Sequence, residues 1–68
     1  MDEEKLNIAI RRFLKKVGIA SQKIIENNII KANKDGLIVK GNEIDLEMTL
    51  IIKNFQTKNT INEKIILE

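Results

Sequence analysis

The sequence predicts an α+β fold in which two N-terminal helices pack on a two- or three-stranded antiparallel sheet. Before Gly36 the apolar residues recur at spacings of three and four, which is the period of a helix. After Gly36 they recur at spacings of two, which is the period of a strand with one buried face. A chain of 68 residues suits one small domain, so we expect a single domain over residues 1–68.

The first helix is expected over residues 3–17. Asp2 suits the N-cap, and Gly18 suits the left-handed position that follows a helix end. One face of this helix carries its apolar residues, which are Leu6, Ile10, Phe13, Leu14 and Val17.

The second helix is expected over residues 21–34. Ser21 is a good N-cap residue, and Gly36 suits the position just past the C-terminus. Its apolar stripe consists of Ile25, Ile29 and Ala32.

Three β-prone segments follow, over residues 37–40, 43–53 and 60–67. The first either joins the sheet as a third strand, through a two-residue turn at Gly41-Asn42, or only connects the second helix to the sheet. Residues 54–59 read as a polar loop. The alternation assigns one inward face to the sheet, made of Ile44, Leu46, Met48, Leu50, Ile52, Ile61, Ile65 and Leu67.

The outer face of the sheet is expected to expose two isoleucines, Ile51 and Ile66. Two apolar residues on adjacent strands could form a small patch, and oligomerisation is a common remedy for the small core of so short a chain. We therefore expect a protein-interaction or structural module whose partner is another protein or a second copy of itself. A homodimer would form through this face or through the free edge of the sheet.

Several missing residue types argue against catalysis. The chain has no Cys, His, Tyr or Trp, so it lacks the side chains that most often act as bases and nucleophiles near neutral pH. It has no glycine-rich phosphate loop, and Glu43, Asp45 and Glu47 lie on a flat strand that would not converge on a metal ion. We expect no enzyme activity, no cofactor, no metal and no small-molecule substrate.

Basic residues concentrate in the N-terminal half. Residues 11–34 contain seven Lys or Arg and a single acidic residue, Glu26. This concentration supports an alternative hypothesis, a winged-helix-like nucleic-acid-binding protein that uses the basic helix pair. Its phosphate and base contacts would come from Arg11, Arg12, Lys15, Lys16, Ser21, Gln22 and Lys23.

The location is expected to be cytoplasmic, without a membrane partner. The N-terminus is acidic where a secretory signal would be basic, and no apolar run approaches the roughly 20 residues of a transmembrane helix. The excess of Ile, Lys and Asn is typical of an AT-rich genome, which favours a bacterial source.

Four stretches carry a family resemblance: Glu3 to Asn7, Ile10 to Gly18, the Asp35 to Leu37 turn, and the closing Leu67-Glu68. Together with Ser21-Gln22 they resemble a family of short bacterial proteins of unknown function, of almost this length. The resemblance spans the whole chain and departs from the pattern in the Asn- and Ile-rich stretch from Asn27 to Asn33. It implies a small cytoplasmic domain and no particular activity.

Overall fold

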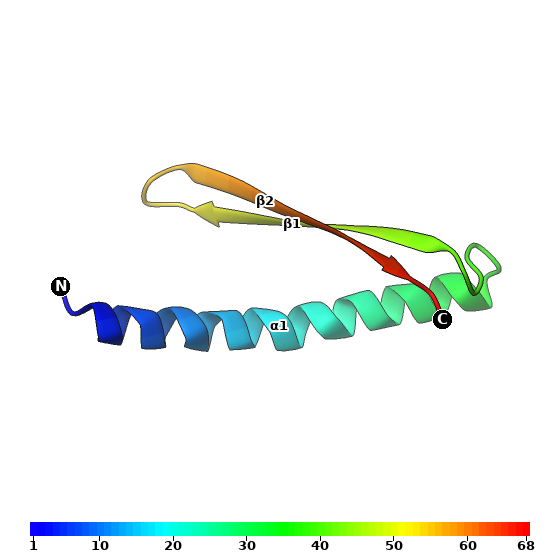
Figure 1. The fold of residues 1–68 in the computed structure, drawn as a ribbon, viewed down its shortest axis with the longest axis horizontal. Helices are drawn as coiled ribbons and strands as arrows, with labels where there is room; N and C mark the ends of the chain where they lie inside the picture. The colour runs from blue at the N-terminus through cyan, green and yellow to red at the C-terminus, as the bar shows by residue number, and fades with distance from the viewer. The chain divides into compact units, whose positions relative to one another are not determined.

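The computed structural model describes all 68 residues, which form one helix and one β-hairpin (Figure 1). The elements are α1 (Glu3–Lys34), β1 (Glu43–Ile52) and β2 (Thr57–Ile66). The chain divides into two units, Met1–Leu37 and Ile38–Glu68, and each is described by itself. The α+β class is confirmed, whereas the prediction of two N-terminal helices is wrong. That the whole chain forms one domain stays a prediction.

Both ends of α1 are capped as the sequence predicts. The Asp2 carboxylate accepts hydrogen bonds from the backbone N–H groups of Glu4 and Lys5, at 3.0 and 3.2 Å. At the other end Gly36 has φ +76°, and its N–H donates to the Asn33 carbonyl. The next N–H, that of Leu37, donates to the Ala32 carbonyl. These two bonds form a Schellman motif, which satisfies carbonyls that have no partner within the helix.

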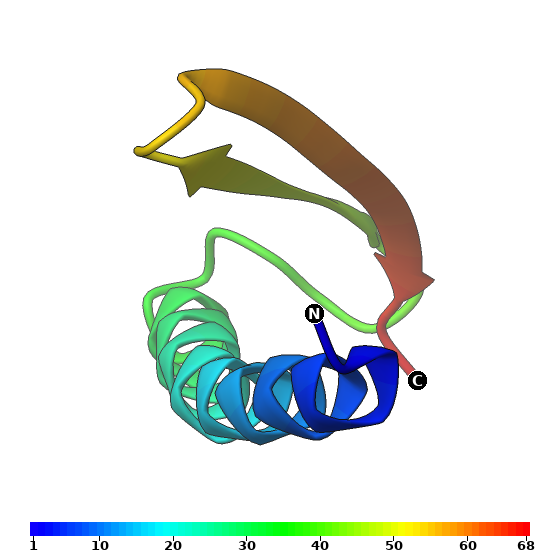
Figure 2. The same cartoon turned by 90° about the vertical axis from the view of Figure 1, so that its left-hand side faces the viewer.

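The predicted break between residues 17 and 21 does not occur. Gly18 is not among the residues with positive φ, so it does not adopt the left-handed conformation of a helix terminator. Ser21 does not cap a helix either, because its hydroxyl donates to the carbonyl of Val17, one turn earlier. The helix therefore continues through both residues for 32 residues, or about 48 Å. Figure 2, turned by 90°, also shows it as uninterrupted.

The two predicted apolar faces join into one stripe along α1. We call apolar stripe the residues Leu6, Ile10, Phe13, Leu14, Val17, Ile25, Ile29 and Ala32. At 100° per residue the stripe drifts by about 80° between its N-terminal and C-terminal halves. The least exposed residues of α1 are four members of the apolar stripe, Val17, Ile25, Ile29 and Ala32, together with Ser21.

The hairpin pairs β1 and β2 along their whole length, from Glu43 opposite Ile66 to Ile52 opposite Thr57. Its half-buried residues all belong to the face that the alternation assigned inward: Ile44, Leu46, Leu50, Ile65 and Leu67. That face is confirmed. Residues 37–40 form no strand, so the sheet has two strands.

The turns account for the strand boundaries. β1 and β2 are joined by residues 53–56, in which Phe55 N–H donates to the Ile52 carbonyl and Gln56 has φ +57°. This connection is shorter than the predicted loop 54–59, so β2 begins three residues early. Before β1, a turn bonds Asn42 N–H to the Val39 carbonyl at 3.1 Å. Gly41, with φ +93°, occupies its second central position rather than the first, as in a type II turn.

Candidate functional site

The predicted patch of Ile51 and Ile66 is not assembled by the hairpin. The pairing places Ile51 opposite Lys58, near the turn, and Ile66 opposite Glu43, at the other end of the hairpin. Eight residues of strand, or about 26 Å, separate the two positions. Both side chains are exposed, at 59% and 61%, but they are single apolar residues and not one surface.

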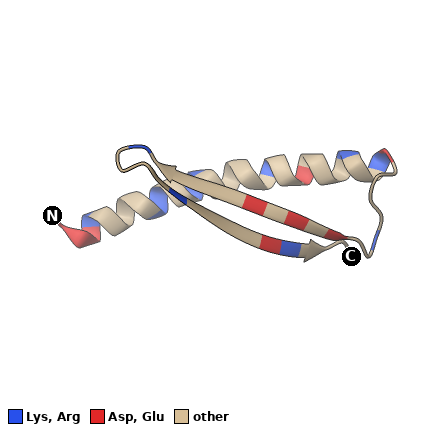
Figure 3. Ribbon diagram, turned by 90° about the horizontal axis from the view of Figure 1, so that it is seen from above, with Lys and Arg blue, Asp and Glu red and all other residues tan.

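The rest of this outer face is charged or polar. Glu43, Asp45 and Glu47 alternate along the first half of β1 (Figure 3). Lys64 lies directly opposite Asp45, and its ammonium group lies 3.8 Å from the Glu43 carboxylate. No group of three or more acidic side chains gathers closely enough to hold a metal ion.

The inner face of the hairpin is the larger apolar surface. Its apolar residues are Ile44, Leu46, Met48, Leu50, Ile52, Ile61, Ile65 and Leu67. Three polar residues of β2, Thr57, Asn59 and Glu63, lie on the same face, because they pair with Ile52, Leu50 and Leu46. Even here Met48 and Ile61 expose 42% and 66% of their surface. Two strands shield each other only at their edges, so this face needs a covering layer to become a core.

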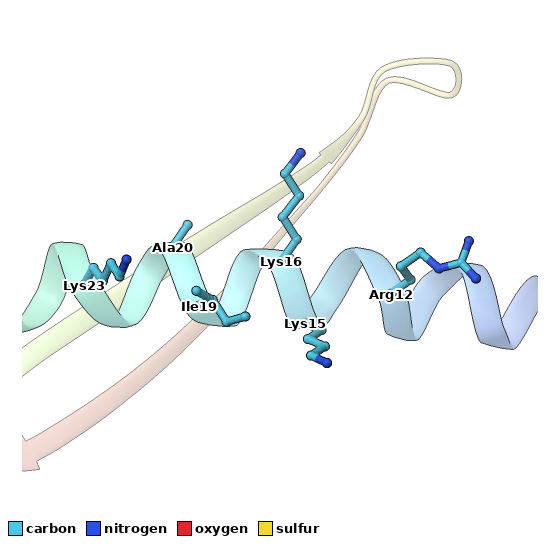
Figure 4. Close-up of a pocket in the computed structure, with 6 residues that line it drawn as sticks. All are labelled: Arg12, Lys15, Lys16, Ile19, Ala20 and Lys23. Atoms are coloured by element: carbon cyan, nitrogen blue, oxygen red, sulfur yellow. The ribbon is translucent and has the colours of Figure 1, made fainter.

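The predicted nucleic-acid contacts divide between different sides of α1. Arg12, Lys15, Lys16 and Lys23 line one shallow hollow on the helix surface, with Ile19 and Ala20 between them (Figure 4). Arg11, Ser21 and Gln22 do not line it. The Ser21 hydroxyl is bound to the backbone, and the Gln22 amide donates to the Glu26 carboxylate at 2.9 Å. Because there is one helix, the helix–turn–helix geometry of the alternative hypothesis is wrong.

A longer basic surface runs along the helix through this hollow. Lys5, Arg12, Lys16, Lys23 and Lys34, which we call the basic stripe, fall within a sector of about 40° at 100° per residue. The only other residue in that sector is Ile30. The centre of the basic stripe lies about 160° around the helix from that of the apolar stripe. Figure 3 shows basic positions distributed along α1.

Sequence reasoning missed Lys5 and Lys34 as members of this surface. Division of α1 at Gly18 hid the relation between its two halves. The detectable signal is a repeat of 11 residues, which is three turns of helix plus about 20°. It links Lys5 to Lys16 and links Arg12 to Lys23 and Lys34.

The hollow offers little for covalent chemistry. Its lining contains cations and aliphatic groups but no carboxylate, hydroxyl or amide side chain. Covalent catalysis usually requires a nucleophile and a base within hydrogen-bond reach of each other. The residues that line the hollow do not include such a pair. The hollow and its flanks are suited to binding a negatively charged group.

No helix of the chain combines the length and the apolar composition needed to cross a membrane. Searches of curated proteins and of solved structures find no match to the chain. One family model matches the chain, and the match covers residues 1–68, which include both α1 and the hairpin. The chain belongs to the Family of unknown function (DUF6494).

Proposed function

We propose that this chain is a non-catalytic protein-interaction module that associates with a second copy of itself. The surfaces that associate are the apolar stripe of α1 and the inner face of the hairpin. One observation carries the proposal: neither the helix unit nor the hairpin unit buries a side chain by itself, although 43% of the chain's residues are hydrophobic.

A second copy covers these surfaces better than the chain's own hairpin could. Each 10-residue strand is about 33 Å long, whereas α1 is about 48 Å long. A hairpin laid on its own helix would therefore leave about a third of the helix uncovered. The apolar stripe, however, extends from Leu6 to Ala32, almost the whole helix. Helices from two copies can match each other along this length.

Sedimentation equilibrium over a wide range of protein concentrations tests the proposal. We expect the mass of a dimer or larger oligomer, with dissociation on dilution accompanied by loss of helical circular dichroism. A monomer mass that does not change with concentration, in a chain that remains folded, would refute self-association.

A matched pair of substitutions locates the interface. Ile25 lies in the apolar stripe and is half-buried, whereas Ile30 lies on the opposite side and exposes 53% of its surface. Ile25→Glu places a charge in the interface, so we expect it to weaken association by at least tenfold, because an unpaired buried charge is unfavourable. Ile30→Glu makes the same chemical change and should leave the mass unchanged. Equal effects of the two variants would contradict the assignment of the apolar stripe.

A further inference from the structure

We infer that the basic stripe of α1 binds the phosphate backbone of duplex nucleic acid without regard to base sequence. This binding is independent of self-association, because the two activities use opposite sides of the helix. The net charge of the chain is only +2, but the charges are segregated. The basic stripe itself carries five cations and no acidic residue.

The cations of the basic stripe are not neutralised within the chain. The structure contains two ion pairs, Lys31 with Asp35 and Lys64 with Glu43, and neither involves a stripe residue. Five unpaired cations make the potential along one side of the helix positive, and this potential attracts a ligand with regularly spaced negative charge. This is the property of the stripe that points to a polyanion.

The dimensions of the basic stripe favour a duplex over other polyanions. From Lys5 to Lys34 the stripe is about 44 Å long at 1.5 Å per residue. Duplex DNA presents one negative charge per about 1.7 Å of its axis and does so over any length. The acidic strand of a second copy is a poorer match, because Glu43 to Glu47 covers only about 13 Å and Lys64 already neutralises part of it.

An anionic bilayer also fits the basic stripe less well. A helix that lies on a membrane inserts its apolar face and keeps its cations near the headgroups of the same leaflet. In α1 the apolar stripe and the basic stripe lie on opposite sides, so a helix that inserted one would hold the other away from the surface. Contacts from the basic stripe to phosphate oxygens carry no base information, so we expect no sequence preference.

Fluorescence anisotropy with a labelled duplex of about 20 base pairs, longer than the basic stripe, tests this inference across a salt series. We expect the full chain to bind at low salt, with affinity falling steeply as salt rises. The triple variant Arg12→Gln, Lys16→Gln, Lys23→Gln should reduce the slope of log K against log salt by about 2.7 and weaken binding at least tenfold at about 0.1 M salt. The single variant Arg12→Gln should reduce the slope by about 0.9.

The control variant removes the same charge elsewhere. Lys40→Gln, Lys53→Gln, Lys58→Gln alters only the hairpin unit and should retain the slope and affinity of the unmodified chain. Circular dichroism establishes that each variant retains its helix. Equal losses in the two triple variants, or no duplex binding at low salt, would overturn the inference. So would tighter binding to poly-glutamate or to phosphatidylserine vesicles than to the duplex.

Discussion

Substitution of Gly18 by alanine is expected to stabilise the protein, and the reason lies in the continuity of α1. Glycine in the interior of a helix is less favourable than alanine by about 0.8–1 kcal/mol. A Cβ atom added at Gly18 would meet no atom within 4 Å, and the backbone there is not left-handed. Gly18→Ala should therefore gain about 1 kcal/mol, because no atom of the same chain clashes with the added methyl group.

The matched variant is Gly36→Ala, at the Schellman motif. Gly36 also has open space around an added Cβ atom, but its φ of +76° is unfavourable for any L-residue with a side chain. This change should destabilise the protein by about 1 kcal/mol. The two variants add the same methyl group to the same helix, so their opposite signs isolate the effect of backbone conformation.

Urea and thermal unfolding, followed by far-UV circular dichroism at one fixed protein concentration, measure both variants. The two midpoints should move apart by the equivalent of about 2 kcal/mol, or roughly 8–16 °C for a chain of this size. If Gly18→Ala destabilised the protein as much as Gly36→Ala, Gly18 would have to be left-handed. The single-helix description of residues 3–34 would then be refuted.

Two further substitutions test the same structure at other points. Ser21→Ala should leave the free energy of unfolding unchanged or raise it by a few tenths of a kcal/mol, because the Ser21 hydroxyl donates to the Val17 carbonyl within a continuous helix. Urea unfolding measures this change. A loss of about 1 kcal/mol would instead show that Ser21 caps a helix. Gln56→Gly should raise the unfolding midpoint by the equivalent of about 0.5–1 kcal/mol, because Gln56 has φ +57° in the hairpin turn. A lower unfolding midpoint for Gln56→Gly would contradict this expectation, because it would show that the Gln56 side chain stabilises the fold by more than its backbone conformation destabilises it.

The parts of the fold that local chemistry determines could be predicted from the sequence. Asp2 caps α1 because its carboxylate reaches two N–H groups that have no partner within the helix. Gly36 ends α1 because it adopts a conformation that other residues avoid. The inner face of the hairpin follows from alternation alone, since successive strand residues point to opposite sides.

The continuity of α1 could not be predicted because the local signals at residues 18–21 are ambiguous. Gly18 and Ser21 are both typical of a helix end followed by a helix start. Retaining Gly18 inside a helix costs about 1 kcal/mol. Ending the helix there would forgo several backbone hydrogen bonds and require a second, unfavourable nucleation. The continuous helix is favoured by this balance, which residue preferences taken one at a time do not reveal.

The separation of Ile51 and Ile66 depends on the length of the hairpin connection. A loop over residues 54–59 would pair residue 53 with residue 60, and the two isoleucines would then lie about 13 Å apart along the sheet. The observed connection of four residues moves the pairing and doubles that distance. Register follows from turn geometry, which the polar composition of residues 54–59 does not specify.

The arrangement of α1 explains how one short chain could support two kinds of binding. The centres of the apolar stripe and the basic stripe lie about 160° apart around the helix, and the angular sectors of the two stripes do not overlap. Burial of the apolar stripe between two copies therefore leaves the basic stripe of each copy exposed. Each dimer would then carry two basic stripes on its outer sides, and these stripes would face away from each other. One straight duplex cannot contact both stripes, so association through the apolar stripe should leave the duplex affinity of each chain unchanged.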